Sequence, residues 1–177
     1  VGKEKTKTKI DRILSPDEYQ DLLVAGSKSN LPFLADIIEF SYITAMRFGE
    51  ITKLETKDIN FENKTALLRD TKNGEDRIVP LTNRALEICN KYRFRDKLFG
   101  INRDKFRHYF EQACKRANVK NFRFHDLRAC AITNLFLRGW SVAEVSVVSG
   151  HKTWSELKRY TRIKPLDLVK KINEGVA

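Results

Sequence analysis

Apolar residues recur at helical spacing over most of the chain, and this pattern predicts a mainly α-helical fold. The first helix begins after Ser15, whose capping-box partner is Glu18. A second helix, over residues 31–45, is apolar around most of its circumference, so we expect it to lie at the centre of the fold. A third, short helix begins near Phe48. Further helices are predicted over residues 83–92, 103–117, 126–138, 142–148, 154–160 and 166–173.

The pattern changes between residues 59 and 80, where short β-prone runs replace the helical spacing. Two such runs, residues 65–68 and 77–79, flank the dipeptide Asn73-Gly74. Asn-Gly between two β-prone runs is a strong signal for a hairpin. We therefore expect an α+β fold that is mainly α with one small antiparallel sheet.

Length and composition favour one globular domain. The chain has 177 residues, of which 41% are hydrophobic, which is enough to build a core and excludes wholesale disorder. No apolar run approaches the roughly 18 residues of a membrane span, so we expect a soluble, cytoplasmic protein with no membrane partner. The cysteines Cys89, Cys114 and Cys130 lack metal-ligand spacing, and their odd number fits a reducing compartment. We interpret them as buried apolar residues and expect no metal site.

Positive charge is concentrated in one part of the sequence. The net charge is +11, and residues 91–123 hold eleven basic and three acidic residues, whereas residues 10–90 are net acidic. Such a segment predicts contact with a polyanion, although a solvated helix face would give the same pattern. If the polyanion is a nucleic acid such as DNA, the candidate binding residues are Arg103, Lys105, Arg107, Lys115, Arg116, Lys120 and Arg123.

A histidine and an arginine three residues apart, His125 and Arg128, stand at the start of a predicted helix. Residues i and i+3 share one helix face, and backbone N–H groups at a helix N-terminus favour an anion. The two side chains could therefore grip a phosphate. Taken alone, the pair also fits a structural histidine and a surface arginine.

A tyrosine among basic residues, Tyr160, lies nine positions after His151. Neighbouring cations lower the pKa of a phenol and bind phosphate, as a tyrosine nucleophile acting on a phosphodiester requires. Tyr160 could instead be a rim residue of an amphipathic helix.

Arg47 follows a strongly apolar helix, where an arginine needs a partner or a ligand. Glu50, three residues later, could orient Arg47, or the two could form a structural ion pair. Lys72 lies beside the predicted hairpin turn and could be a solvated turn lysine.

The order and spacing of these residues resemble the catalytic domain of the tyrosine recombinases, the phage integrase family: Arg47, Glu50, Lys72, His125, Arg128, His151 and Tyr160. Residues 51–59 and 77–81 also resemble segments of that family, and the resemblance extends over about residues 13–163. The chain departs from the family pattern just before Arg47 and at Ser149, where leucine is commoner, but neither change removes a functional group.

The resemblance implies the catalytic-core fold shared by tyrosine recombinases and type IB topoisomerases, and a reaction without metal or cofactor. Tyr160 would be the nucleophile that forms a 3′-phosphotyrosine. Arg47 and Arg128 would clamp the scissile phosphate, with a further hydrogen bond from His151. Lys72 would protonate the 5′-oxygen leaving group, His125 would accept the tyrosine proton, and Glu50 would hold Arg47 in place.

The resemblance also implies a domain organisation and partners. Residues 1–12 would be an interdomain linker, residues 13–164 the catalytic domain and residues 165–177 a C-terminal tail helix. The partners would be double-stranded DNA and other protomers in a tetrameric synapse, with an N-terminal core-binding domain absent from this chain. The protein would be nucleoid-associated and encoded by a bacterium, phage or mobile element. The alternatives are a type IB topoisomerase-like enzyme that relaxes DNA and a catalytically silent DNA-binding homologue.

Overall fold

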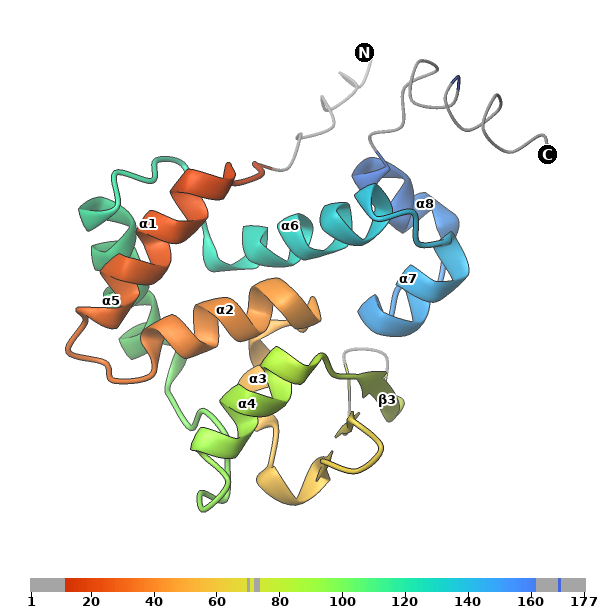
Figure 1. Ribbon diagram of the computed structural model, residues 1–177, viewed down its shortest axis with the longest axis horizontal. Coiled ribbons are helices and arrows are strands. Elements are labelled where there is room, and N and C mark those ends of the chain that lie inside the picture. The colour runs from red at the N-terminus through yellow and green to blue at the C-terminus, as the bar shows by residue number, and fades with distance from the viewer. Residues whose placement is uncertain (1–11, 70, 72–73, 162–168, 170–177) are drawn as a thin grey trace, which may run out of the picture.

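Helix α2 (Leu34–Thr44) lies at the centre of the fold, as its apolar circumference predicts. The computed structural model describes residues 12–69, 71, 74–161 and 169. Helix α2 contacts α1 (Pro16–Ser27), α3 (Phe48–Lys53), α4 (Asn83–Lys91) and α6 (Phe124–Leu137). Figure 1 shows α6 running beside α2. Helix α6 carries His125 and Arg128, and the chain that leaves α2 leads directly to Arg47 and α3.

Smaller helices complete the two ends of the domain. Helix α5 packs on α1 at one end, and α7 joins α6 to α8 at the other (Figure 1). The remaining elements are α5 (Arg103–Arg116), α7 (Val142–Ser149), α8 (Trp154–Leu157) and the 3-10 helices η1 (Thr56–Asp58) and η2 (Lys158–Tyr160).

The sheet has three antiparallel strands in the order β1-β2-β3. The strands are β1 (Ile59–Asn60), β2 (Thr65–Leu68) and β3 (Arg77–Pro80). The β2–β3 register pairs Leu68 with Arg77, which brings Arg77 to the end of the sheet where β3 begins. The two predicted strands are confirmed, and the short β1 is an addition that two residues of pattern could not reveal.

Two helices start at a different residue than predicted, and several helix ends differ by one residue. Helix α2 begins at Leu34, three residues later than predicted, because Pro32 disfavours helical backbone at Leu31 and removes an N–H donor. Helix α6 begins at Phe124, two residues early, because the Asp126 carboxylate accepts the backbone N–H of Arg123. Residues 154–160 split into α8 and η2, and the predicted helix at 166–173 falls outside the described residues except for residue 169.

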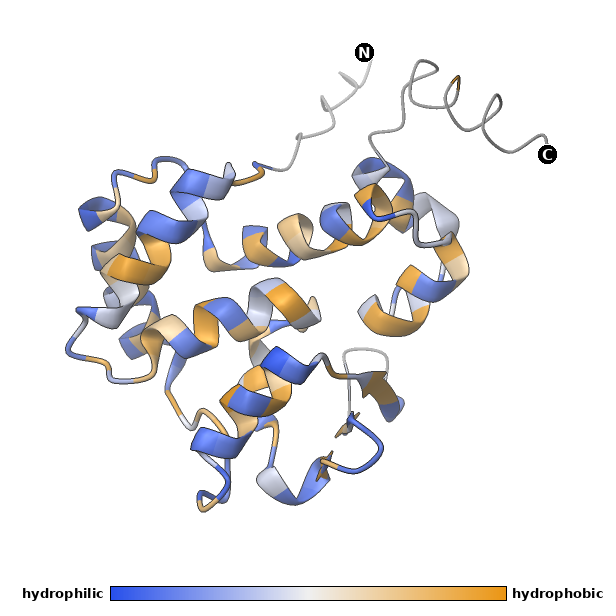
Figure 2. Ribbon diagram, in the orientation of Figure 1, coloured by the Kyte–Doolittle hydropathy of each residue, from blue (hydrophilic) through white to orange (hydrophobic). Residues whose placement is uncertain are grey.

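The hydrophobic core has two parts. The larger surrounds α2, and Figure 2 shows hydrophobic residues along α2 and over much of α7. The smaller joins α6, α7 and α8 and includes Ala45, Ile132, Leu157 and Tyr160. All three cysteines are buried and unbridged, as predicted. Among the described residues, no helix is long and apolar enough to cross a membrane.

Candidate active site

Arg47 and Glu50 meet at the N-terminus of α3. The chain turns sharply there, because Ala45 adopts a left-handed conformation (φ 56°) at the end of α2. The Glu50 carboxylate accepts hydrogen bonds from the backbone N–H of Arg47 at 2.8 Å and from Arg47 Nη1 at 2.9 Å. Glu50 is buried while the Arg47 side chain is 24% exposed. Glu50 therefore fixes both the backbone and the guanidinium of Arg47.

A second arginine, Arg77 of β3, binds the same carboxylate. Arg77 Nη1 donates to Glu50 Oε1 at 2.7 Å, and Nη2 donates to Oε2 at 3.1 Å. Burial acts to raise the pKa of Glu50, but hydrogen bonds from Arg77 and Arg47 outweigh it and lower the pKa. Sequence reasoning treated Arg77 as part of a strand segment and missed it as a site residue. Its one sequence signal is a charge in a strand that is otherwise apolar.

Arg128 is held in the interior beside this network. Its side chain is buried, Nη1 donates to the backbone oxygen of Ala45, and Nη2 donates to the backbone oxygen of Ser149 at 2.6 Å. Arg128 thus joins α6 to the end of α2 and the end of α7. Burial, and then the nearby charge of Arg47, lowers the pKa of Arg128 to about 10, so it stays cationic at neutral pH.

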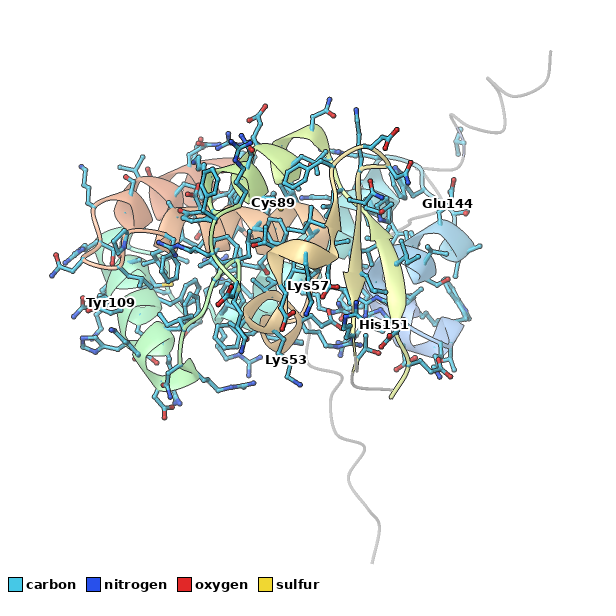
Figure 3. All side chains as sticks on the ribbon, turned by 90° about the horizontal axis from the view of Figure 1, so that it is seen from below. Lys53, Lys57, Cys89, Tyr109, Glu144 and His151 are labelled. Carbon is cyan, nitrogen blue, oxygen red and sulfur yellow. The ribbon has the colours of Figure 1, made fainter. Side chains whose placement is uncertain are left out.

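The surroundings of both site histidines favour the neutral imidazole by lowering its pKa. Desolvation, and then the charge of Arg128, lowers the pKa of His125, and the same two causes lower that of His151 to about 4. His151 Nδ1 is hydrogen bonded to Ser149 Oγ at 2.8 Å. Figure 3 shows His151 beside the strands of the sheet. A neutral imidazole at each position is free to accept a proton.

Tyr160 packs next to His151, with ring centroids 5.9 Å apart. The tyrosine is only 2% exposed and belongs to the smaller core cluster, where η2 contacts α6. Its Oη accepts a hydrogen bond from Arg159, whose guanidinium also lies over the phenol ring at 4.8 Å. The phenol is therefore enclosed by protein and in contact with a cation.

A pocket of about 430 Å³ gathers most of the predicted phosphate-binding residues. Its lining includes Arg47, Glu50, His125 and Arg128. His151 lines a neighbouring pocket of about 340 Å³, whose lining also includes Arg77. Tyr160 lines neither pocket. Lys72 lies outside the described residues.

Three further cations, Lys53, Arg69 and Arg103, line the larger pocket. Sequence reasoning had counted Arg103 among the DNA-binding candidates only. Among the described residues, five cations and one carboxylate line this pocket, and one of the cations, Arg69, also pairs with Asp58 at 2.7 Å. The net positive charge favours an anionic ligand. Among the described residues, no cluster of His, Cys, Asp and Glu has the geometry of a metal site.

Comparison with known proteins decides the family. The sequence pattern of the phage integrase family matches residues 12–166. The chain belongs to this family. The resemblance inferred from the spacing of the site residues is thereby confirmed.

The relatives of this integrase domain are longer than the domain itself. A shufflon-specific DNA recombinase of Escherichia coli is 34% identical over 176 residues, which cover 98% of this chain and 46% of the relative. Tyrosine recombinase XerA of Saccharolobus solfataricus is 32% identical over 136 residues, covering 75% of this chain and 46% of the relative. The chain thus spans about half the length of the curated relatives it matches.

Solved structures confirm the fold expected for an integrase domain. The catalytic domain of bacteriophage HP1 integrase superposes with a TM-score of 0.74 at 22% identity, covering 91% of this chain and 93% of that one. A crystal structure of XerA recombinase gives a TM-score of 0.69 at 20% identity, covering 93% of this chain and 65% of that one.

The candidate DNA-binding residues of the basic segment lie on and after α5. All seven candidate DNA-binding residues are exposed. Some are committed to protein contacts, because Arg107 pairs with Glu111 at 3.1 Å and Arg123 pairs with Asp126 at 3.3 Å. Arg103 lies over the Phe48 ring at 5.4 Å, so this residue connects the α5 surface to the larger pocket.

Proposed function

We propose that this chain is the catalytic domain of a site-specific DNA recombinase that cleaves and rejoins DNA through a 3′-phosphotyrosine. The observation that carries the proposal is the meeting of Arg47, Arg128 and His125 at one cationic pocket, with Tyr160 packed close by. The relatives, which include a shufflon-specific DNA recombinase and tyrosine recombinases, point to the same activity. Residues 13–164 would form the catalytic domain, with residues 1–12 as linker and 165–177 as tail.

The two arginines would bind the non-bridging oxygens of the scissile phosphate. Arg47 is held by Glu50 yet partly exposed, and Arg128 is fixed by two backbone oxygens, so both cations are preorganised before DNA binds. Such donors stabilise the charge that develops in the transition state, and removing one typically costs ~2.7–4 kcal/mol in rate terms. His151 would add a hydrogen bond to the same phosphate.

Cleavage would transfer the phosphoryl group to Tyr160. Tyr160 Oη attacks phosphorus, the P–O5′ bond breaks, and a phosphotyrosyl bond forms on the 3′ side. His125 takes the phenolic proton, and Lys72 supplies a proton to the departing 5′-oxygen. Attack by a free 5′-hydroxyl reverses these steps and rejoins the strand. General acid and base groups each contribute typically ~10²–10⁴-fold in rate.

Tyr160 has to leave its core position before it reacts. The phenol is 2% exposed and lines neither pocket, so a phosphate held by Arg47 and Arg128 cannot be attacked from the arrangement described. We infer that DNA binding moves η2, the short helix that carries Tyr160, toward the phosphate.

The proposed partners are duplex DNA and further protomers of the recombinase in a tetrameric synapse. Two structural neighbours support DNA as the partner, a λ integrase dimer bound to a core site and XerH recombinase bound to its difH substrate. The exposed basic residues on α5 would follow the DNA backbone, with affinity that falls steeply as salt rises.

A covalent-capture experiment tests the function. The chain is incubated with a pool of nicked duplexes whose sequence around the nick is randomised, so that the cleaved strand loses a short fragment and the adduct accumulates. We expect wild type to form a denaturant-resistant protein–DNA adduct with a subset of sequences. The Tyr160→Phe variant should bind the selected duplex and form no adduct. An adduct in the variant, or none in wild type, would overturn the proposal.

A further inference from the structure

Arg77 makes a two-pronged ion pair in the interior of the site. Its two terminal nitrogens each bind a different oxygen of Glu50, at 2.7 and 3.1 Å, and its side chain is only 15% exposed. A parallel pair of charge-assisted hydrogen bonds fixes both partners in orientation as well as distance. Glu50 therefore has one strongly preferred position.

The other side of the Arg77 guanidinium packs against Gly150. A Cβ atom at Gly150 would lie 2.7 Å from Arg77 Nη1 and 2.9 Å from Cζ, closer than real Cβ contacts come. Gly150 also has a left-handed backbone (φ 69°) that ends α7. The residues on either side of it both belong to the site, since the Ser149 oxygen accepts from Arg128 and His151 follows. Arg77 thus lies between the α3 and α7 parts of the site.

Two cations share one carboxylate in this arrangement. Glu50 binds Arg77 through two nitrogens, whereas the described contacts of the Arg47 side chain with Glu50 use Nη1 alone. Without Arg77, the same carboxylate could rotate into a two-pronged pair with Arg47. That pair would compete directly with a phosphate for the Arg47 guanidinium.

We propose that Arg77 is a positioning residue of the proposed recombinase reaction: by occupying Glu50 and packing against Gly150, it keeps Arg47 available to the phosphate and sets the place of His151. The inference rests on the function proposed above. Arg77 acts through Glu50 and the α7 terminus, so its loss should slow cleavage more than it weakens DNA binding.

The test uses a duplex selected with the wild-type chain. Single-turnover adduct formation and DNA affinity are measured for Arg77→Ala and Arg77→Lys. We expect Arg77→Ala to cleave at least about tenfold more slowly, as loss of an orienting residue commonly does, with a dissociation constant within threefold of wild type. Guanidinium ion should restore part of the Arg77→Ala rate, while sodium chloride at equal ionic strength should not.

The control is Arg84, whose guanidinium also makes a two-pronged pair, with Glu39 at 2.8 Å, but neither residue lines either pocket. Arg84→Ala should cleave within twofold of wild type and gain nothing from guanidinium. Arg77→Lys keeps the charge without the fork, so it should fold if Arg77→Ala does not and should still cleave slowly.

The outcomes separate the inference from the function. If wild type forms an adduct and the Arg77 variants cleave at its rate, the inference is wrong and the function stands. The inference also fails if both Arg77 variants lose DNA binding in proportion to rate, or if guanidinium gives no rescue in a folded Arg77→Ala. Absence of a wild-type adduct would overturn the function and the inference with it.

Discussion

Replacing Glu50 by glutamine should destabilise the fold by about 3 kcal/mol at pH 7. The carboxylate accepts four hydrogen bonds, from the Arg47 backbone, Arg47 Nη1 and both terminal nitrogens of Arg77. Glutamine keeps the shape but removes the charge and presents an NH₂ group to some of these donors. Removing one partner of a buried ion pair costs about 3–5 kcal/mol. We take the lower end, because the Arg47 and Arg77 side chains are 24% and 15% exposed and water can reach them.

The stability that Glu50 contributes depends on pH. Although burial opposes it, hydrogen bonds from the two arginines lower the pKa of Glu50 below its usual 4.5. The stabilisation by the carboxylate is therefore complete above pH 4.5 and is lost as pH falls through the lowered pKa. At still lower pH the protonated Glu50 resembles glutamine, and the two proteins should converge in stability.

Urea unfolding of wild type and Glu50→Gln between pH 3 and 7 measures this difference. Glu111→Gln is the matched control, because Glu111 is 62% exposed and pairs with Arg107 at (i, i+4), which contributes about 0.3–0.5 kcal/mol. A loss below 1 kcal/mol for Glu50→Gln at pH 7, or an equal loss at pH 3, would refute the role assigned to the carboxylate.

Three further predictions concern other parts of the chain. Gly150→Ala should lower the free energy of unfolding by about 1–3 kcal/mol, because it strains the backbone and clashes with Arg77. Gly49→Ala has open space at its Cβ and should stabilise α3 by roughly 0.5–1 kcal/mol. Calorimetry of the two variants measures both changes, and the opposite ranking would contradict the packing described at Gly150. Burial raises the pKa of Cys89 to about 12 and of Cys114 and Cys130 to about 11. A thiol reagent should therefore label the native chain slowly and the unfolded chain rapidly at all three cysteines. Rapid labelling of the native chain would contradict this burial. Lys105→Ala should reduce the slope of log affinity for duplex DNA against log salt by about one, as anisotropy titrations would show, and an unchanged slope would remove Lys105 from the DNA surface.

The helical framework followed from sequence because its signals are local. Ser15 with Glu18 forms the capping box that the sequence predicts. The late start of α2 depends on Pro32, whose effect on the preceding residue is also local but competes with a continuous apolar pattern. The exact start of such a helix can be read only from the backbone structure, whereas the presence of the helix can be predicted from the sequence.

The site was only partly accessible from sequence. The spacing of Arg47, Glu50, His125 and Arg128 predicted residues that the structure places around one pocket. The part played by Arg77 depends on the β2–β3 register and on the contact between Arg77 and Gly150. Arg77 and Gly150 are 73 positions apart in the sequence, so no local pattern reveals their contact. The enclosure of Tyr160 is likewise a packing property, since the same residue in the same helix could have been exposed.

The most direct test of the proposed 3′-phosphotyrosine is to identify the protein atom that is covalently bonded to the DNA. The adduct formed with a selected nicked duplex is digested with protease and nuclease, and the nucleotide-bearing peptide is sequenced by mass spectrometry. The account predicts a phosphodiester link between the 3′ end of the cleaved strand and the phenolic oxygen of Tyr160. A nucleotide on any other residue, or attachment through a 5′ phosphate, would contradict it.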